Sequence, residues 1–385
     1  MIKNFTFTGA GKILFGWGIC EGLGDCLAEL SCRRPLVVMD GALAAQGLKE
    51  RIADILARRG LKTIFFDGVE PEPPLETADE GAKAALRGKC DAVVGIGGGS
   101  AMDTAKAIAV VAAHRAKAAE FLGLNKVPGP GLKTVMVPTT AGTGSEVTFT
   151  AVFVRKDLNK KEGMNSPFLY PTVALLDPEL TLTLPPFPTA TTGIDALCHA
   201  IESYTSRNSS PMSELFSLEA VALIGGYIRV AVHDGRNAEA RSNMLLASLY
   251  AGLGLANAGV TAVHSLSYPL GGRYGIPHGL ANTVLLPAVM NFNLPGCLDK
   301  FADLAEALGE ETEGLSVREA AGRAVEAVEA LIEDCGVAMS LEDLDIPEED
   351  FADLAEQALT VTRPLENNPR KIDREAALEI YRAAW

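Results

Sequence analysis

Short runs of almost uninterrupted apolar residues alternate with amphipathic stretches through the first part of the chain. The apolar runs at residues 34–41, 62–68, 90–100 and 133–140 predict strands, and the stretches at residues 42–60, 75–89 and 101–114 have helical spacing. Strands that are apolar on both faces are typical of parallel sheets covered by helices on each side. We therefore expect an α/β domain built on a parallel sheet.

The rhythm changes after this first part. Two further strands are predicted at residues 148–157 and 172–178, either as an extension of the sheet or as a hairpin against it. A cluster of prolines at residues 185–188 then marks a boundary, because proline interrupts both helices and central strands. Beyond this cluster nearly every stretch has helical spacing. The prediction is an α/β domain over residues 1–186 and an all-helical domain over residues 187–385, which suits the length of the chain.

Charge and cysteine content narrow the possible partners and the location. The net charge of −15 and the pI of about 4.9 argue against binding to nucleic acids or to anionic membrane surfaces. The seven cysteines are scattered and include no C-x-x-C pair, so reduced thiols in a cytoplasmic protein are expected. The first residues lack the features of a signal peptide, and no apolar run approaches the length of a membrane span.

A glycine-rich turn lies between the third predicted strand and the following helix, in GIGGGSAMDTAK (residues 95–106). Gly97, Gly98 and Gly99 would let backbone N–H groups approach an oxyanion, and the helix that follows would contribute its positive end. Ser100 is predicted to cap this helix, with Asp103 reaching back as in a capping box or else serving the ligand. The spacing is not that of the dinucleotide fingerprint, so a tight turn without a ligand remains an alternative.

A second such turn follows the fourth predicted strand, in PTTAGTGSEVT (residues 138–148). Its hydroxyl groups, among them those of Thr139, Thr140 and Ser145, suit a ribose or a phosphate, although a capped turn would look the same. Asp40 ends the first predicted strand, where a carboxylate can accept hydrogen bonds from ribose hydroxyls and would repel a 2′-phosphate. The alternative for Asp40 is an ordinary Asp-Gly turn residue.

Three of the five histidines lie in the helical half together with one well-placed carboxylate. Asp195 and His199 share a helix face at i, i+4 spacing, and His264 and His278 follow in glycine-rich segments of low charge. Imidazole and carboxylate are ligands of Zn²⁺, Fe²⁺ and similar ions. Each histidine alone could equally be a hydrogen-bonded core or turn residue, and Cys198 is expected to be a packed small hydrophobe.

The motifs GGGSAMDTAK, PTTAGTGSE, DPELTLTLP, TGIDALCHAIE, HSLSYPLGG, IPHGLAN and NNPR occur in this order. Their order and spacing resemble those of the iron-containing (group III) alcohol dehydrogenases, and the resemblance covers essentially the whole chain. It implies a fold like that of dehydroquinate synthase, with an N-terminal Rossmann-like parallel-sheet domain, a C-terminal all-helical domain and a cleft between them. It also implies that Asp195, His199, His264 and His278 are the metal ligands.

The same resemblance implies how NAD is bound. Gly97, Gly98, Gly99 and Ser100 correspond to the pyrophosphate loop, with Asp103 close behind, and Asp40 to the ribose carboxylate that selects NAD. Contacts to the nucleoside and nicotinamide correspond to Thr139, Thr140, Ser145 and Phe149, and the nicotinamide-ribose lysine corresponds to Lys161. Residues aligned near the substrate are Thr150, Leu255 and Pro364.

Two positions depart from the family pattern. Some members have a second histidine, assigned to proton transfer, where this chain has Tyr268, so a proton relay here would use its hydroxyl, water or ribose hydroxyls. Many members have an asparagine near the adenosine in a P-N-P turn, and this chain has Glu72 there, in PEPP. That contact is therefore not expected.

These expectations combine into one reaction. The resemblance implies reversible hydride transfer between NAD and a short primary alcohol or diol, or its aldehyde, at a divalent ion. Fe²⁺ is the first candidate ion, with Zn²⁺ or another divalent ion as alternatives. A glycerol-type polyol dehydrogenase and a non-catalytic NAD- and metal-binding protein are the rival interpretations. A homodimer or higher homo-oligomer is expected, with the N-terminal strand as a pairing edge.

Overall fold

The computed structural model describes residues 4–155 and 160–385, which divide into two compact units. Unit 2 comprises Gly9–Thr140 and Ser145–Thr181, and unit 1 comprises residues 4–8, Ala141–Gly144 and Leu182–Trp385. The chain enters unit 1 for good at Leu182, whereas the predicted boundary lies between residues 186 and 187. Nothing in the sequence pattern indicated that residues 4–8 and 141–144 belong with the helices.

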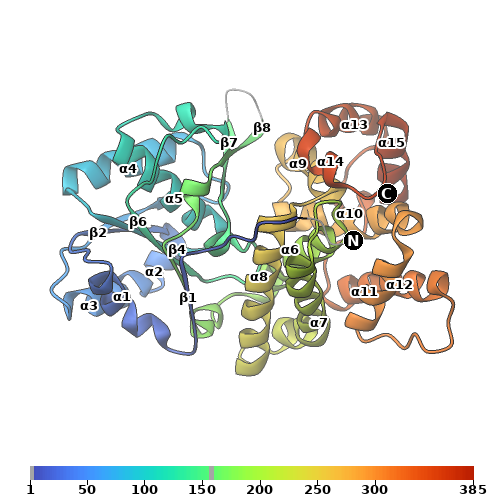
Figure 1. Ribbon diagram of the computed structural model, residues 1–385, viewed down its shortest axis with the longest axis horizontal. Coiled ribbons are helices and arrows are strands. Elements are labelled where there is room, and N and C mark those ends of the chain that lie inside the picture. Colours follow the sequence, from blue (N-terminus) through green and yellow to red (C-terminus); the bar gives the residue numbers. More distant parts are fainter. Residues whose placement is uncertain (1–3, 156–159) are drawn as a thin grey trace. The chain divides into compact units, whose positions relative to one another are not determined.

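Unit 2 is built on a six-stranded sheet in which every pair of neighbouring strands is parallel (Figure 1). The strands, in their spatial order, are β1 (Lys12–Phe15), β9 (Val173–Leu176), β6 (Lys133–Pro138), β4 (Ala92–Gly97), β2 (Pro35–Asp40) and β3 (Ile64–Val69). The predicted parallel sheet is confirmed. Its carboxyl ends carry both glycine-rich turns and Asp40, because the turns come at the ends of β4 and β6 and Asp40 is the last residue of β2.

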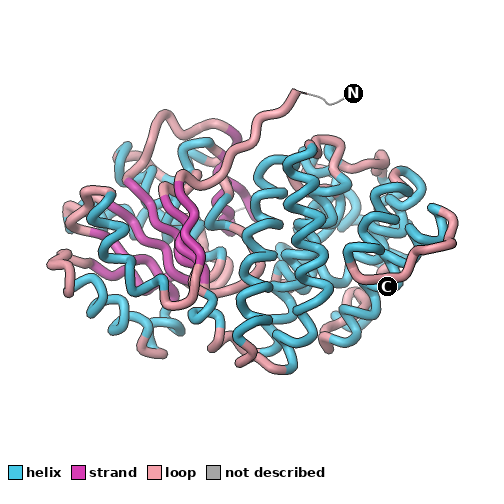
Figure 2. Tube along the Cα trace, turned by 60° about the horizontal axis from the view of Figure 1, so that its bottom comes forward, coloured by secondary structure: helices cyan, strands magenta, loops and turns pink. Residues whose placement is uncertain are grey.

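Helices cover both faces of this sheet, as Figure 2 shows. The helices of unit 2 are α1 (Leu23–Glu29), α2 (Gly41–Ala45), α3 (Leu48–Ala57), α4 (Glu76–Gly88) and α5 (Gly99–His114). In β2, Val37 and Met39 join a buried cluster with residues of α1 and α3, while Leu36 and Val38 join another with residues of α4 and α5. Since side chains of a strand alternate between faces, a strand with a core on each side is apolar throughout.

The helix predicted over residues 42–60 is wrong in one respect, because two helices, α2 and α3, occupy this stretch. Gly47, between them, has a φ of 89°, a left-handed conformation that a continuous right-handed helix cannot contain. The apolar spacing on either side of Gly47 looks continuous in sequence. The break therefore depends on the backbone conformation of one glycine.

The two further predicted strands have different fates. Residues 172–178 contain β9, a strand of the main sheet, while residues 148–157 contain β7 (Thr150–Arg155), which forms an antiparallel hairpin with β8 (Lys160–Asn165). Residues 156 and 157 of that prediction lie outside the described residues. The hairpin belongs to a three-stranded sheet with β5 (Gly123–Leu124). The polar sequence of β8, KKEGMN, offered no apolar pattern from which to predict a strand.

Unit 1 is helical from Leu182 onward. Its α-helices are α6 (Pro186–Thr205), α7 (Pro211–His233), α8 (Ala238–Ala258), α9 (Ala262–Tyr274), α10 (His278–Asn293), α11 (Leu298–Ala307), α12 (Val317–Asp334), α13 (Phe351–Leu359), α14 (Thr362–Asn367) and α15 (Arg374–Ala383). Short 3₁₀ helices occur in both units, at Ile19–Gly22, Ala118–Phe121, Ser145–Val147, Pro167–Leu169, Pro178–Thr181, Leu294–Gly296, Glu342–Leu344 and Glu348–Asp350. The predicted all-helical C-terminal part is confirmed.

The helix α7 is long and apolar enough to cross a membrane by length and composition alone, and α8 with α9 passes the same test as a pair bent by 103°. Glu219 and Arg229 interrupt the apolar sequence of α7, so it has no unbroken apolar run of that length. It packs against α6 and α8 within unit 1. Core helices of globular proteins meet the same criterion, so the finding is weak support for a membrane span.

The late NNPR motif connects distant parts of unit 1. The side chains of Asn368 and Asn293 exchange two hydrogen bonds of 2.7 and 2.9 Å, and the Asn367 amide donates to the Val260 carbonyl at 3.0 Å. Asn208 donates to the side-chain oxygen of Asn367 at 2.6 Å. These contacts fix the segment after α14 against α10 and against the loops after α6 and α8.

Candidate metal and cofactor sites

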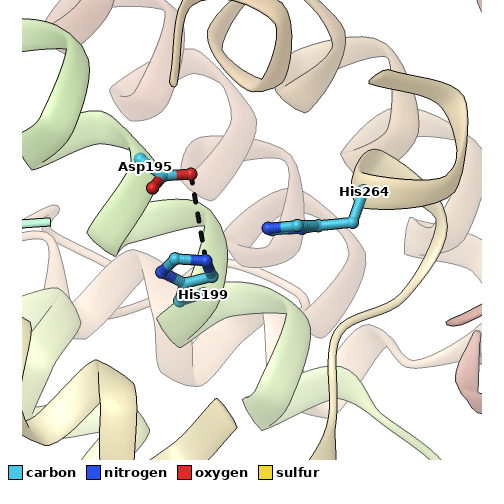
Figure 3. A group of neighbouring side chains, drawn as sticks. All are labelled: Asp195, His199 and His264. Carbon is cyan, nitrogen blue, oxygen red and sulfur yellow. Dashed lines mark ion pairs between the residues drawn. The ribbon is translucent and has the colours of Figure 1, made fainter. Parts of the chain in front are cut away.

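Asp195 and His199 lie one turn apart on α6, as Figure 3 shows, and only 3% and 5% of their surfaces are exposed. Pro185 precedes this helix and Pro186 occupies its first turn, a position that suits proline because the missing N–H would have no helical partner. The His199 Nε2 atom lies 3.9 Å from Asp195 Oδ1, and its Nδ1 lies 3.3 Å from the Gly142 carbonyl oxygen. The prediction that Asp195 and His199 share one face of a helix is confirmed.

Two further histidines reach this pair from other helices. His264 lies in the first turn of α9 and His278 begins α10. One ligand atom from each of Asp195, His199 and His264 lies within 4.8 Å of the others, and the His278 Nε2 atom lies 3.9 Å from Asp195 Oδ1. The structure therefore brings together all four predicted ligand side chains. Their role as metal ligands remains a prediction.

Gly279 explains how α10 comes so near to α6. A Cβ atom at this position would lie 2.5 Å from the Thr191 carbonyl oxygen and 3.5 Å from the Asp195 Cβ atom. Only glycine permits this approach without a shift of the backbone. The residue after His278 is thus required for His278 to stand beside Asp195.

The Asn282 side chain provides a test of whether a cation fits here. Its Nδ2 atom lies 2.7 Å from Asp195 Oδ1 and 3.3 Å from the Nε2 atoms of both His264 and His278. Its own Oδ1 is buried and has no hydrogen-bond partner among the described residues. One amide group with two hydrogens thus faces one carboxylate oxygen and two imidazole nitrogens, each of which can accept a hydrogen bond or bind a cation. Converging acceptors that outnumber the available donors are what a cation site presents.

The charge of the cluster points the same way. Asp195 and Glu202 are buried carboxylates, 3% and 1% exposed, and among the described residues neither has a lysine or arginine within ion-pair distance. Buried charges are normally paired or bound to metal ions. A divalent cation would balance the charges of the two carboxylates, and the three imidazoles would bind it in their neutral form. The residues therefore fit the metal that the sequence resemblance implies.

The pKa values of the cluster follow from burial and from the neighbouring charges. Burial favours a neutral Asp195, but His199, His278 and His264 outweigh it and hold the pKa of that carboxyl below its ordinary value. Burial lowers the pKa of His199. For His264 burial acts downward, but the Glu202 carboxylate acts upward more strongly and raises the pKa. Burial likewise raises the pKa of the Cys198 thiol, which fits the prediction of a packed small residue.

Tyr268 stands against the histidines at the place where some relatives have a second histidine. Its ring centroid lies 5.8 Å from that of His278 and 6.4 Å from that of His264. Burial raises the pKa of Tyr268 to about 12. Its hydroxyl therefore keeps its proton at neutral pH.

The first glycine turn, in unit 2, joins β4 directly to α5. Gly97 ends the strand with a φ of 145°, and the helix begins at Gly99 with Gly98 as its N-cap. The prediction that Ser100 caps this helix is wrong, because Ser100 lies inside its first turn, where its Oγ accepts a hydrogen bond of 3.2 Å from the Glu72 N–H. With Gly98 as the cap, the start of this helix has no side-chain capping hydrogen bond among the described residues.

The capping-box prediction for Asp103 is also wrong. Its Oδ1 accepts a hydrogen bond of 2.5 Å from Ser145 Oγ, and its Oδ2 accepts one of 2.8 Å from the Val152 N–H. Asp103 therefore joins α5 to the second turn, because its carboxylate points across to that segment and not back along its own helix. Lys106, which the sequence analysis did not single out, lies 3.0 Å from Asp103 Oδ1.

The second turn lies beside the first. The Thr139 N–H donates to the Gly97 carbonyl at 3.0 Å, and a Cβ atom on Gly98 would lie 3.6 Å from the Thr140 side chain. Asp40 is also near, since one of its carboxylate oxygens would lie 3.5 Å from a Cβ atom on Gly97. The other oxygen caps α2 by accepting from the Leu43 N–H at 2.8 Å. Asp40 is therefore a turn residue that also borders the glycine turn.

The remaining predicted residues are placed as follows. The Phe149 ring packs against the Tyr170 ring, with 5.4 Å between the ring centroids. Lys161 forms an ion pair with Glu72, with 2.6 Å between Nζ and Oε1; Glu72 is the residue that stands where many family members have the asparagine of the P-N-P turn. Thr150, in unit 2, donates its hydroxyl hydrogen to Asn165 Oδ1 at 2.8 Å. Leu255 is half-buried on α8 and Pro364 is buried on α14, both in unit 1. The substrate set stays a prediction.

Sequence reasoning missed three residues that contact predicted site residues, namely Glu202, Asn282 and Lys106. Glu202 follows His199 by three positions and Asn282 follows His278 by four, so both share helix faces with predicted ligands. That spacing, in otherwise apolar helices, was a usable signal. Lys106 follows Asp103 by three positions and carried the same signal, although a lysine in a helix is most often exposed.

Comparison with known proteins identifies the family. The family model described as iron-containing alcohol dehydrogenase matches residues 10–178, and the model for the C-terminal part of the iron-containing alcohol dehydrogenase family matches residues 189–385. The chain belongs to the iron-containing alcohol dehydrogenase family, a family of oxidoreductases, as the sequence motifs predicted.

Similar proteins cover almost the full length of this chain. A long-chain-alcohol dehydrogenase of Geobacillus thermodenitrificans is 39% identical over 96% of this chain and 94% of its own length. An NAD-dependent methanol dehydrogenase of Bacillus methanolicus is 38% identical over the full length of both chains. A crystal structure of a 1,3-propanediol oxidoreductase superposes with a TM-score of 0.97 at 36% identity and covers 100% of both chains.

Proposed function

We propose that this protein is an NAD-dependent dehydrogenase of short primary alcohols or diols that requires a divalent cation, with Fe²⁺ as the first candidate. The observation that carries the proposal is the buried cluster of Asp195, His199 and His264, whose ligand atoms lie within 4.8 Å of one another. The cluster has no lysine or arginine counter-charge among the described residues. Zn²⁺ and other divalent ions accept the same ligand types, so the ion itself must be measured.

Asp195, His199, His264 and His278 would hold the cation. A bound divalent cation supplies Lewis acidity, which makes an alcohol hydroxyl a stronger acid, and NAD accepts the hydride. The contribution of the chain is to keep these four side chains in place and out of bulk water. In the oxidation, the alcohol carbon gives up a hydride and its hydroxyl gives up a proton.

The residues of unit 2 are proposed to bind NAD. The N–H groups in the first turn of α5, uncapped by any side chain of that turn, would face the pyrophosphate, as helix N-termini commonly do. Asp40, Thr139 and Thr140 border this turn and would contact the ribose and nucleoside. The Asp40 carboxylate would disfavour the 2′-phosphate of NADP by charge repulsion.

Asp103 and Ser145 have a different role in this proposal from the one expected. Their side chains hydrogen-bond each other, so they are better suited to holding the two turns together than to contacting NAD. Lys161 would have to exchange its ion pair with Glu72 for a ribose hydroxyl. Phe149 offers an apolar ring to the nicotinamide end.

Tyr268 is the proposed path for the substrate proton. Because its hydroxyl keeps its own proton at neutral pH, it acts by donating a hydrogen bond and exchanging protons, and not as a base. The expected result for Tyr268→Phe is slower turnover with unchanged metal content and unchanged NADH affinity. Turnover equal to that of the wild type would assign the relay to water or ribose hydroxyls.

The proposed substrates are weakly polar, because Leu255 and Pro364, the predicted substrate residues of unit 1, are apolar. The names of the two sequence relatives range from methanol to long-chain alcohols, so family membership leaves the chain length open. No observation favours the glycerol-type polyol alternative. Including glycerol in a substrate panel separates the two.

The deciding experiment is elemental analysis of anaerobically purified protein, followed by NADH absorbance with a panel of primary alcohols, diols and glycerol in the presence of Fe²⁺ or Zn²⁺. Asp195→Ala and His264→Ala should each lose bound metal and activity while the fold survives. Full turnover by a metal-free variant would contradict the proposal. Metal and NADH binding without turnover of any alcohol would support the non-catalytic alternative.

A homodimer is proposed as the assembly. The strand β1 stands at the end of the sheet order and exposes Ile13 and Phe15 by 38% and 37%. An apolar edge strand of this kind is a natural place for a second copy to pair. Sedimentation or light scattering tests the assembly, and the cytoplasmic location stays a prediction.

A further inference from the structure

The carboxylate of Glu202 is a buried charge that the proposed reaction does not use. It lies on α6, seven residues after Asp195 and three after His199, and its side chain is 2% exposed. Positions separated by three, four and seven residues share one face of a helix. One face of α6 thus carries two predicted metal ligands and, a turn further on, this second carboxylate.

Glu202 receives three hydrogen bonds, all from the start of α9. Its Oε1 accepts from the Val263 N–H at 2.7 Å and from the Thr261 hydroxyl at 2.8 Å, and its Oε2 contacts His264 Nδ1. The N-cap residue of α9, Thr261, supplies no side-chain cap. A carboxylate from another helix therefore caps α9, where the helix dipole favours negative charge.

The contact to His264 determines which nitrogen the imidazole presents. A carboxylate can only accept, so Nδ1 must carry the hydrogen, and the lone pair of the neutral ring then lies on Nε2. The Nε2 atom is the one that lies 3.3 Å from the Asn282 amide, in the cluster with Asp195. Glu202 thus fixes both the tautomer and the direction of His264.

His264 differs in this respect from His199. The Nδ1 of His199 faces a neutral backbone carbonyl, that of Gly142, at 3.3 Å. A carboxylate partner makes an imidazole a stronger electron donor than a carbonyl partner does, and such partners commonly affect metal affinity by 10- to 100-fold. The two imidazoles are therefore expected to contribute unequally to binding.

We infer that Glu202 is a positioning residue that sets metal affinity through His264, by holding its Nδ1–H and by anchoring the first turn of α9 to the helix that carries Asp195 and His199. The inference rests on the proposed metal-binding function. Helix α6 would then position three of the four predicted ligands. It carries Asp195 and His199 itself and holds His264 through Glu202.

The test is Glu202→Gln, with Zn²⁺ as the probe and its dissociation constant measured by competition with a chelating dye. Glutamine keeps the size but replaces one acceptor oxygen by an NH₂ group, which must oppose either the Val263 N–H or His264 Nδ1–H. The expected result is Zn²⁺ binding that is about 10- to 100-fold weaker. A Co²⁺-loaded variant should also show a changed visible absorption spectrum, because the histidine ligand is no longer held in one orientation.

Glu214→Gln is the matched control. Glu214 lies on α7 in the same unit and pairs with Lys300 and Ser209, away from the predicted ligands. A merely structural effect of losing a carboxylate would lower stability in both variants and leave the Zn²⁺ dissociation constant and the Co²⁺ spectrum unchanged. Thr261→Val removes one of the three donors to Glu202 and keeps the contact to His264, so it should weaken Zn²⁺ binding less than Glu202→Gln does.

The possible outcomes separate this inference from the function it rests on. Equal Zn²⁺ affinity of Glu202→Gln and wild type overturns the inference alone, whereas a wild-type protein that binds no divalent ion overturns the proposed function. If Glu202→Gln does not fold, Glu202→Asp takes its place, since it keeps the charge but withdraws it from His264. Weaker Zn²⁺ binding by the folded aspartate variant supports the inference, and unchanged binding contradicts it.

Discussion

Replacing Lys106 by methionine would leave the Asp103 carboxylate, whose side chain is 14% exposed, without its cation. Lys106 is 1% exposed, and its Nζ lies 3.0 Å from Asp103 Oδ1. The same ammonium group donates to the Ser145 carbonyl at 3.1 Å and to the Thr150 carbonyl. A single charge therefore joins α5 to the second turn and to the first residue of β7. Desolvation lowers the pKa of Lys106, and Asp103 opposes that shift.

The size of the effect follows from these contacts. Removing one member of a buried ion pair costs about 3–5 kcal/mol. Here the Asp103 carboxylate loses its counter-charge and keeps only its hydrogen bonds from Ser145 and Val152. Methionine has nearly the length of lysine and leaves little empty space, so no large cavity contribution is added. Two carbonyls that lose a donor are part of the same loss. We expect the free energy of unfolding of unit 2 to fall by about 3–5 kcal/mol. This is a large part of the stability of an ordinary domain, which is about 5–15 kcal/mol.

The two tryptophans of the chain make this effect measurable for one unit. Trp17 belongs to unit 2 and Trp385 to unit 1, so a Trp385→Phe background leaves fluorescence from unit 2 alone. Urea unfolding in this background gives the free energy for Lys106→Met, and exposed Lys83→Met serves as control with an expected change under about 0.5 kcal/mol. Asp103→Asn completes a double-mutant cycle, in which the double variant should lose less than the sum of the single losses.

A loss below about 1 kcal/mol for Lys106→Met, or strictly additive losses in the cycle, would refute this reasoning. The first result would mean that the buried ammonium gains nothing from Asp103 and the two carbonyls. The second would mean that Asp103 and Lys106 act independently. In either case the two turns would be held together by their backbone contacts and not by the ion pair.

Three further predictions concern other positions. Burial raises the pKa of Glu146 from 4.5 to about 7, so the native state holds this proton more tightly than the unfolded state does. The free energy of unfolding should therefore fall by about 3 kcal/mol as pH rises from 4.5 to 7. Urea titrations at pH 5 and pH 8 measure this fall, and Glu146→Gln should remove it. Gly144→Ala should destabilise unit 1 by more than about 2 kcal/mol in thermal unfolding, because φ at this position is 60° and the new Cβ atom would lie 2.5 Å from the Gly252 Cα atom. A Tm equal to that of the wild type would contradict the close approach. Asp40→Ala should weaken the preference for NAD over NADP and, through loss of the cap to Leu43, cost about 1 kcal/mol, and an unchanged ratio of kcat/KM values for the two coenzymes would argue against a ribose contact.

Local pattern was sufficient for part of the fold. The parallel sheet and the helical second half could be predicted because burial on both faces leaves apolar strands and because helices have their own period. The break at Gly47 and the strand β8 could not. Gly47 interrupts a pattern that stays periodic on both sides, and β8 is stabilised by its hairpin with β7, whatever the polarity of its side chains.

The candidate site divides in the same way. Asp195 and His199 could be paired from spacing alone, since four residues make one turn of a helix. Ser100 and Asp103 were misassigned because a local capping motif was expected, whereas their hydrogen bonds go to Glu72, Ser145 and Val152, far away in sequence. Capping motifs are local rules, and a partner from another segment overrides them.

The sequence by itself determined the family, the types of the predicted ligands and the elements that carry them, because periodicity and motif order are properties of neighbouring residues. Only the tertiary structure decided that His264 and His278 meet Asp195, that Glu202 holds His264, and that Lys106 is buried against the second turn and the start of β7. Each of these contacts joins residues separated by tens of positions, and such contacts form where packing of whole helices and strands brings them together. Packing depends on every segment at once, and so no single stretch of the chain encodes it.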